Sequence, residues 1–340
     1  MTEPRMTDQV ARAFSGRRVL VTGGAGFVGG SLVRRLAESG ARVTVLDDLF
    51  TGQSEIVPTN AQLVVGSVVD EALVRELVGD SSVVFHMAAR NIIASTKDPR
   101  EDFATNIGGT LNVLLAARDS KVDRVVYTGS TSIYGNPRSI PINEDDTPVA
   151  LSPYAVSKLG GELYCNAFYE NYGVPVSVVR YSNVFGIGQR PDNPYCGVIG
   201  KFFAAAFEGK PLQVHGDGEQ TRDYTYIDDA VDATLLAAIR PRAEGEMSNV
   251  GTGIETSVND LALKIGQAVG VDVDIVHIDR RDIDNIRRRV VNIEKARRML
   301  RWSPQITLTA GLERTAGWMR NSSFEAPTAD PPSTRALTAS

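Results

Sequence analysis

The chain has 340 residues, 42% of them hydrophobic, and 36 Lys and Arg against 41 Asp and Glu give it a formal net charge of −5. So many apolar residues can bury a large core, which excludes disordered and fibrous classes, and a mildly acidic chain without a long basic run is not expected to bind nucleic acid or an anionic membrane. Two cysteines are too few for a disulfide framework. No apolar run approaches the roughly 18–20 residues that cross a bilayer, and the polar N-terminus lacks the apolar core of a signal peptide. We therefore expect a cytoplasmic protein.

Short β-branched runs alternate with helical patterns in the first half of the chain. Strands are predicted at residues 18–22, 42–46, 62–65, 82–86, 124–128 and 176–180, and helices at 27–39, 106–118 and 153–172. Nearly continuous apolar strands that alternate with helices are typical of a parallel sheet covered on both faces.

Beyond about residue 185 this alternation gives way to loops and mixed segments, which indicates a smaller second domain. We expect a flexible tail at 1–16, a sheet domain at 17–184, a smaller domain at 185–320 with some segments returning to the first, and a Pro-, Thr-, Ser- and Ala-rich flexible tail at 321–340.

A glycine-rich turn directly follows the first predicted strand, with Gly23, Gly26 and Gly29 each three residues apart. Glycine permits the positive φ of a tight turn and lets a pyrophosphate approach the backbone, and the following helix presents free amides to the phosphates. The alternative is a purely structural turn between strand and helix. The second predicted strand leads to Asp47, at the interval of a ribose-binding acid. A carboxylate there repels a 2′-phosphate, so the pattern predicts NAD binding rather than NADP.

The segment Tyr154-Ala-Val-Ser-Lys158 places a phenol and an ammonium on one helix face. A nearby ammonium stabilises phenolate, so the pKa of Tyr154 is expected to fall from about 10 toward neutrality and make it a base. By itself the pair is equally typical of an amphipathic surface helix. Ser130, however, follows the predicted strand 124–128, at the sheet edge where parallel strands present ligands.

With these motifs in place, the chain from about Arg18 to Trp318 resembles the extended short-chain dehydrogenase/reductase family, specifically its nucleotide-sugar epimerases and dehydratases. The resemblance implies a Rossmann-type doubly wound sheet with a smaller, partly interleaved C-terminal α/β domain, and a nucleotide sugar in the cleft between them. It assigns catalysis to Ser130, Tyr154 and Lys158. It also implies that the residues binding NAD are Gly23, Gly26, Phe27, Val28, Asp47, Asp48, Ser67, Val68, Met87, Ala88, Ala89, Asn106, Tyr154, Lys158 and Tyr181.

The same resemblance assigns six residues to the sugar nucleotide: Ser95, Ser132, Asn183, Arg222, Arg287 and Arg289. Arg222 and Arg287 match the family's pair on the nucleotide pyrophosphate, and forked guanidinium donors suit phosphate oxygens. Each arginine alone is more typical of a solvated surface charge.

Three features, at four positions, bear on which family member the chain resembles most. Ser67 replaces an Asp that holds the adenine amino group, so a hydroxyl or the backbone is expected to hold adenine here. Thr131 and Ser132 stand where 4,6-dehydratases have Asp and Glu, which disfavours dehydration. Arg289 lies at the sugar-pocket gate, as in UDP-glucuronate decarboxylases, although a solvent-facing basic stretch, residues 287–289, is the alternative.

The resemblance favours a UDP-hexose 4-epimerase that uses NAD. A UDP-glucuronate decarboxylase is the first alternative, and a catalytically silent NAD-binding sensor is the second. The three histidines, His86, His215 and His277, form no metal-ligand pattern, so no metal is predicted. In this family, helices such as those at 106–118 and 153–172 pair across a two-fold axis, so we expect a homodimer built on a four-helix bundle.

Overall fold

The computed structural model describes residues 6–193, 195–280 and 286–322. Within them, seven strands form one sheet in the order β11-β6-β5-β4-β1-β2-β3, and each neighbouring pair is parallel. The strands are β1 (Arg18–Thr22), β2 (Arg42–Asp47), β3 (Gln62–Val65), β4 (Val83–His86), β5 (Arg124–Ser130), β6 (Val176–Tyr181) and β11 (Met247–Val250). The predicted doubly wound parallel sheet is confirmed, and its strand order reverses between β1 and β4.

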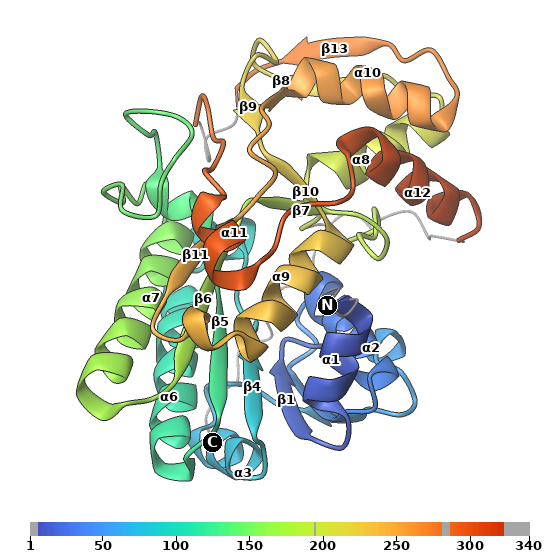
Figure 1. Ribbon diagram of the computed structural model, residues 1–340. Coiled ribbons are helices and arrows are strands. Elements are labelled where there is room, and N and C mark those ends of the chain that lie inside the picture. Colours follow the sequence, from blue (N-terminus) through green and yellow to red (C-terminus); the bar gives the residue numbers. More distant parts are fainter. Residues whose placement is uncertain (1–5, 194, 281–285, 323–340) are drawn as a thin grey trace, which may run out of the picture.

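Helices cover both faces of the sheet (Figure 1). One face carries α3 (Glu71–Gly79), α6 (Gly109–Ser120) and α7 (Pro153–Tyr172), and the other carries α1 (Met6–Phe14), α2 (Phe27–Glu38) and α9 (Ile227–Ile239). Buried side chains such as Val74, Leu114 and Phe168 form the first core, and Leu32 and Val231 belong to the second. The strands are therefore apolar on both faces, which explains their continuous β-branched runs.

The N-terminal segment forms a helix, so the prediction of a flexible tail over residues 1–16 is wrong for the part that the structure describes. Val10 and Phe14 of α1 lie one turn apart and are buried, and the ring of Phe14 packs 6.0 Å from that of Phe85 in β4. Two apolar residues at helical spacing are enough to dock this short helix on the sheet. At the other end, residues 323–340, most of the predicted C-terminal tail, lie outside the described residues.

The last strand of the sheet comes from the second half of the chain. β11 pairs with β6, and α9 packs on α2 and on β6. The two parts of the chain are thus interleaved, as the family resemblance implied.

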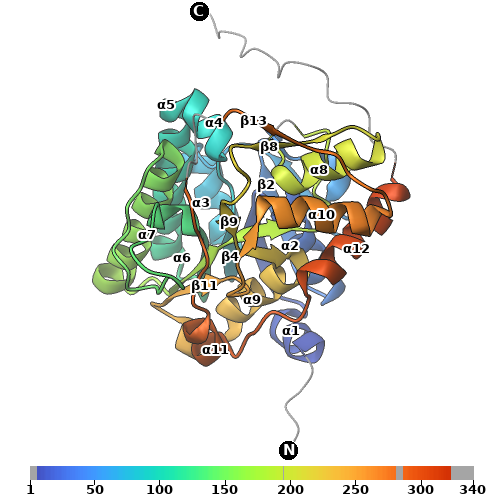
Figure 2. The same ribbon diagram turned by 90° about the horizontal axis from the view of Figure 1, so that it is seen from above.

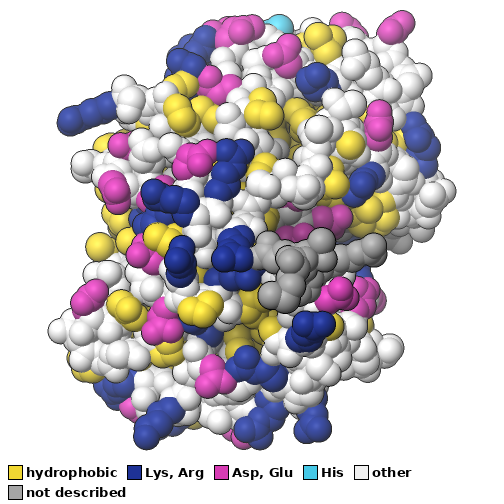
Figure 3. Space-filling model, in the orientation of Figure 1, with side chains coloured by type: hydrophobic (Ala, Val, Ile, Leu, Met, Phe, Trp, Pro, Cys, Tyr) yellow, Lys and Arg dark blue, Asp and Glu magenta, His cyan; other side chains and the backbone are white. Residues whose placement is uncertain are grey.

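Apart from α11 (Glu294–Leu300), which packs on β11 and α9, the remaining helices and strands of the second half gather at one end of the sheet (Figure 1). Three two-stranded pairs occur among the described residues: β7 (Asn183–Phe185) with β10 (Tyr224–Tyr226), β9 (Thr221–Arg222) with β12 (Thr256–Ser257), and β8 (Leu212–His215) with β13 (Ile275–Ile278). The helices are α8 (Val198–Phe207), α10 (Val258–Val269) and α12 (Leu308–Arg320). Seen from above, α10 lies between α8 and α12 (Figure 2). On the face drawn in Figure 3, Lys and Arg side chains gather where the two parts of the molecule meet.

The connection between β4 and α6 is more elaborate than predicted. It contains α4 (Ile92–Lys97), α5 (Pro99–Asp102) and a π-helix (Phe103–Gly108). The predicted helix at 106–118 is therefore divided: its first residues belong to the π-helix, and α6 begins at Gly109. The wider turn places the side chain of Asn106 against the backbone of Arg90. Short 3₁₀ turns occur at Ser54–Ile56, Thr131–Tyr134 and Pro241–Ala243. No helix within the described ranges is long and apolar enough to span a membrane.

Candidate active site

The turn after β1 packs its glycines against the loop that follows β4. Gly23 has a φ of +70°, and a Cβ there would lie 2.7 Å from the amide nitrogen of Ala88. A Cβ at Gly29 would lie 2.1 Å from the carbonyl oxygen of Gly23. Because only glycine fits at these positions, the turn can bring backbone amides and the start of α2 to a phosphate group.

A cavity of about 350 Å³ lies over this turn, at the carboxyl ends of the central strands. Among the predicted residues, those that line it are Gly23, Gly26, Phe27, Val28, Asp47, Asp48, Val68, Met87, Ala88, Ala89, Ser130, Tyr154, Lys158 and Tyr181. The glycine cradle and the acidic end of β2 fit a dinucleotide whose ribose hydroxyls need acceptors.

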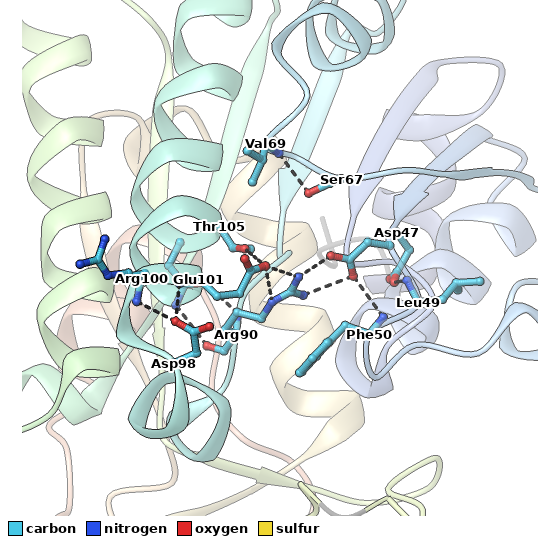
Figure 4. A network of polar contacts seen from close by, with 12 residues as sticks. Asp47, Leu49, Phe50, Ser67, Val69, Arg90, Asp98, Arg100, Glu101 and Thr105 are labelled. Carbon is cyan, nitrogen blue, oxygen red and sulfur yellow. Dashed lines mark hydrogen bonds and ion pairs between the residues drawn. The ribbon is translucent and has the colours of Figure 1, made fainter. Parts of the chain in front are cut away.

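Two predicted cofactor residues stand outside the cavity wall. The hydroxyl oxygen of Ser67 accepts a hydrogen bond from the amide of Val69 at 3.2 Å (Figure 4), so it closes its own turn and leaves Gly66 and Val68 on the wall. Asn106 is 1% exposed and lies behind the wall, where its side chain bonds the backbone of Arg90 and the carboxylate of Asp102. The oxygen of Ser67 is thus engaged by the backbone while its O–H can still donate, and Asn106 fixes the backbone of Arg90, which lines the cavity.

Asp47 ends β2 with its carboxylate held by the backbone. Oδ2 accepts a hydrogen bond from the amide of Ala25 in the glycine turn, and Oδ1 accepts one from Leu49, both at 2.9 Å. Burial raises the pKa of this carboxyl, while the two amides oppose the shift. Each oxygen keeps a further lone pair for a ribose hydroxyl.

Because of this carboxylate, we expect NAD to bind at least about tenfold more tightly than NADP, or about 1.4 kcal/mol. The 2′-phosphate of NADP would meet Asp47 in a partly buried site, where charge repulsion is weakly screened. Calorimetric titration with the two cofactors measures the ratio of their dissociation constants, and Asp47→Asn should reduce this ratio. Asp70→Asn, which alters the cap of α3 instead, should leave it unchanged. Equal or tighter NADP binding to the unmodified protein contradicts the role of Asp47.

Ser130, Tyr154 and Lys158 meet at the edge of the same cavity. Ser130 ends β5, and α7 begins one residue before Tyr154, with Ser152 as its N-cap and Pro153 in the first turn. The hydroxyl of Ser130 lies close enough to the phenol of Tyr154 to lower its pKa. The structure thus brings the three predicted catalytic residues together.

The predicted fall in the pKa of Tyr154 is wrong for this structure. Burial raises the pKa of the phenol above its ordinary value of 10.0, although the hydroxyl of Ser130 and the charge of Arg289 both lower it. Nζ of Lys158 instead donates to the carbonyl oxygen of Thr128 at 2.8 Å. Desolvation of the phenolate outweighs the neighbouring charges here.

Lys158 itself is deeply buried, 3% exposed. Burial lowers its pKa to about 8, while the carboxylates of Glu162 and Asp102 oppose that shift. The ammonium lies 5.0 Å from the centre of the Tyr127 ring, a second favourable contact for a cation. Two nearby carboxylates and one aromatic face thus stabilise the protonated form of Lys158 inside the fold.

A second cavity, of about 300 Å³, lies among the elements of the C-terminal part. Asn183, Arg222 and Arg287, all predicted substrate residues, line it together with Arg280. Nη1 of Arg222 donates to the carbonyl oxygens of Thr221 and Ile286, each at 2.8 Å. Three guanidinium groups on one wall suit a diphosphate.

Arg287 is half exposed and already engaged. Its Nη1 lies 2.8 Å from both carboxylate oxygens of Asp217, and its side chain is 52% exposed. An exposed pair of this kind contributes little to stability, so a diphosphate can compete for the guanidinium.

Three predicted substrate residues, Ser95, Ser132 and Arg289, do not line either cavity. The hydroxyl of Ser95 is fully buried and donates to Asp102 at 2.5 Å and to the carbonyl oxygen of Arg90 at 3.3 Å. The hydroxyl of Ser132 donates to Ser130 Oγ at 2.9 Å. Ser95 therefore supports the wall, and Ser132 orients the catalytic serine.

Arg289 is buried, with 5% exposure, and its charge lowers the pKa of Tyr154. The alternative of a solvent-facing basic stretch is therefore wrong for this residue, whereas the neighbouring Arg288 is exposed and pairs with Glu255. Arg289 places a positive charge near the base.

Comparison with known proteins agrees with this arrangement. Residues 19–251 match the NAD dependent epimerase/dehydratase family. The chain belongs to this family. It is therefore an NAD-dependent nucleotide-sugar enzyme, and its cofactor is NAD.

Individual members of the family differ in their reactions. The chain is 38% identical over 315 residues to a UDP-glucose 4-epimerase of Mycolicibacterium smegmatis, covering 90% of this chain and 99% of the relative. It is 35% identical over 319 residues to a UDP-N-acetyl-alpha-D-glucosaminuronate decarboxylase of Bacillus cytotoxicus, covering 89% and 98%. The crystal structure of UDP-glucose 4-epimerase with UDP-glucose from Thermotoga maritima aligns with a TM-score of 0.86 at 34% identity, covering 89% and 99%.

Sequence reasoning missed two arginines that the cavities contain. Arg90 directly follows the predicted NAD-binding residues Met87, Ala88 and Ala89 and lines the cofactor cavity, so its position next to them was the available signal. Arg280 lines the second cavity, but it lies in a loop whose path no local pattern fixes.

Proposed function

We propose that the protein is a UDP-hexose 4-epimerase in which one NAD takes and returns the hydride. The observation that carries the proposal is the contact between Ser130 and Tyr154 beside Lys158, at a cavity wall shared with the glycine turn. The relative from M. smegmatis and the aligned structure from T. maritima, both named as UDP-glucose 4-epimerases, support it.

The chain's own residues supply proton transfer and binding. When bound, NAD supplies the oxidation and reduction at C4 of the sugar. Tyr154 accepts the proton of the C4 hydroxyl, with Ser130 bridging, and returns a proton to the same oxygen after the 4-keto sugar has turned over. The hydroxyl of Ser130 and the charge of Arg289 oppose the burial that raises the pKa of the phenol, without outweighing it.

The second cavity accounts for retention of the turning intermediate. Arg222, Arg280 and Arg287 hold the diphosphate, which is remote from C4 and unchanged by the reaction. Binding energy at the diphosphate can therefore keep the sugar in place while its ring presents the other face.

The residues after β5 argue against dehydration. Thr131 and Ser132 are both buried beside Ser130, and neither can act as a carboxylate base. Elimination of water needs such a base and acid, so the proposal is restricted to reactions that proceed through C4 oxidation alone.

Decarboxylation of UDP-glucuronate is the second candidate, and Arg289 favours it. A buried guanidinium near Tyr154 suits a substrate carboxylate, and the B. cytotoxicus relative is named as a decarboxylase of a uronate sugar. Oxidation at C4 of such a sugar gives a β-keto acid that loses CO₂.

A panel of UDP-sugars, with products analysed by mass and chromatography, separates the two reactions. Epimerisation of UDP-glucose, UDP-galactose or their N-acetyl forms conserves mass, whereas decarboxylation loses CO₂. Conversion of a neutral sugar supports the proposal. Conversion of UDP-glucuronate alone, with loss of mass, contradicts it.

We further propose a homodimer through α6 and α7, because α7 carries exposed apolar side chains at helical spacing. Val156 and Leu163 are 54% and 62% exposed and lie two turns apart, and Tyr164 is 38% exposed. Burying such a row is the ordinary reason for helices to pair across a two-fold axis.

Light scattering at micromolar concentration should therefore give the mass of a dimer. Leu163→Glu places a charge in the proposed interface and should shift the protein toward the monomer. Leu263→Glu is the matched control, because Leu263 is 52% exposed on α10. A monomeric unmodified protein, or equal effects of both variants, contradicts the proposed interface.

A further inference from the structure

Arg90 connects three segments around the cofactor cavity. Its Nη2 lies 2.7 Å from Asp48 Oδ2 and 2.7 Å from Glu101 Oε1, and Nη1 donates to Asp48 Oδ1 at 3.3 Å. Figure 4 shows the guanidinium between Glu101 and the end of β2, with the Phe50 ring against it. The central carbon of the Arg90 guanidinium lies 4.3 Å from the centre of the Phe50 ring.

The sheet topology shows which part of the molecule the Asp48–Arg90 ion pair, the bridge, crosses. Asp48 follows β2 and Arg90 follows β4, and the sheet order places β1 between those two strands. An ion pair between the two loops therefore spans the carboxyl end of β1, where the glycine turn lies. In doubly wound sheets this is the crevice in which a dinucleotide binds.

The Arg90 end of the bridge is fixed by hydrogen bonds to its backbone and by burial. The Asn106 side chain accepts from the amide of Arg90 at 2.7 Å and donates to its carbonyl oxygen at 3.1 Å. Arg90 itself is only 9% exposed. A guanidinium that two carboxylates share in a partly desolvated place has little freedom to move away.

Phe50 extends the bridge to the other cavity. Its ring lies 5.5 Å from that of Tyr195, and Tyr195 lines the second cavity while Phe50 lines the first. One row of contacting groups, Arg90–Phe50–Tyr195, thus runs from the cofactor crevice to the wall of the substrate cavity.

We propose that Arg90, Phe50 and Tyr195 form a clasp that slows release of NAD, and that a nucleotide in the second cavity strengthens this clasp by fixing Tyr195. A 4-epimerase needs the same NAD to remain bound while the sugar turns over, and the row of contacts provides a route by which bound substrate retains it. If the nucleotide raises the equilibrium affinity for NAD by some factor, NAD must raise the affinity for the nucleotide by the same factor, whereas the two release rates need not change equally.

The experiment measures the rate at which NAD leaves the intact protein. Protein loaded with NAD is freed of excess cofactor and mixed with a dehydrogenase that converts every released NAD to NADH, with and without saturating UDP. Arg90→Met should release NAD at least tenfold faster than the unmodified protein. Arg90→Lys, which keeps the charge but cannot share two carboxylates or stack well, should lie between them.

The UDP arm tests the second half of the clasp. UDP should slow NAD release from the unmodified protein at least threefold, and this slowing should disappear in Tyr195→Leu and Phe50→Leu. Calorimetry shows whether each variant still binds UDP, so that saturating concentrations can be used.

Arg75→Met is the matched control, since Arg75 forms an exposed pair with Glu71 on α3, and it should release NAD at the unmodified rate. Release from Arg90→Met within twofold of that rate overturns the clasp, as does equal release from Arg90→Lys and the unmodified protein. Slowing by UDP that persists in Tyr195→Leu overturns the coupling.

The measurement with UDP rests on the proposed function, because it assumes that the second cavity binds a uridine nucleotide. Failure of UDP to bind in calorimetry contradicts the proposed function, while the Arg90 variants still decide the clasp.

Discussion

Replacing Tyr154 with phenylalanine should lower kcat/KM for the best UDP-sugar by about 10²–10⁴-fold, the range that a general base contributes. The change removes one oxygen and leaves the ring in place, so the contact with the hydroxyl of Ser130 is lost while the packing of α7 is kept. Both the epimerase and the decarboxylase need this base to oxidise C4. Turnover of UDP-glucose and of UDP-glucuronate is therefore measured for the same preparation.

Tyr164→Phe is the control for this variant, because Tyr164 lies on the same helix and is 38% exposed. It should keep activity, and both variants should bind NAD and unfold near the same temperature. A Tyr154→Phe protein that retains more than about a tenth of the activity contradicts a base at this position.

Local patterns were sufficient for the strands and for the phosphate turn. Each strand of the first half carries an apolar run that needs no partner to be recognised, and the spacing of Gly23, Gly26 and Gly29 is itself the property that binds phosphate. Parallel strands then bring their carboxyl ends to one edge. For that reason the position of Ser130 could be placed at this edge from the sequence, whereas Tyr154, on a helix, was placed beside it only by the family resemblance.

Properties that depend on packing were not predictable in this way. The helix α1 has one buried pair, Val10 and Phe14, too short a signal to distinguish from a tail. The hydroxyl of Ser95 in α4 donates to Asp102 at the end of α5, a contact between two short helices that no sequence pattern indicated. The pKa of Tyr154 rises because neighbouring segments remove water from the phenol, and a spacing of four residues along one helix carries no information on burial.

Arg289→Ser separates the two proposed reactions by the size and the pH dependence of its effect. In an epimerase of neutral sugars Arg289 meets no carboxylate, so turnover of UDP-glucose should stay within a few-fold. The loss should be larger at low pH, because removing this positive charge raises the pKa of Tyr154 further and less phenolate is present below it. Activity should therefore recover as the pH rises.

In a decarboxylase the same change removes a buried charged hydrogen bond to the substrate, worth about 1.5–3 kcal/mol. The value of kcat/KM for UDP-glucuronate should then fall roughly tenfold to a hundredfold even at high pH, where the effect on the Tyr154 base is relieved, because the guanidinium itself is a lost partner of the substrate. Arg288→Ser, which alters the neighbouring exposed arginine that pairs with Glu255, should leave both activities unchanged. We expect the epimerase pattern. It is contradicted if the unmodified protein releases CO₂ from UDP-glucuronate and leaves UDP-glucose, UDP-galactose and their N-acetyl forms untouched.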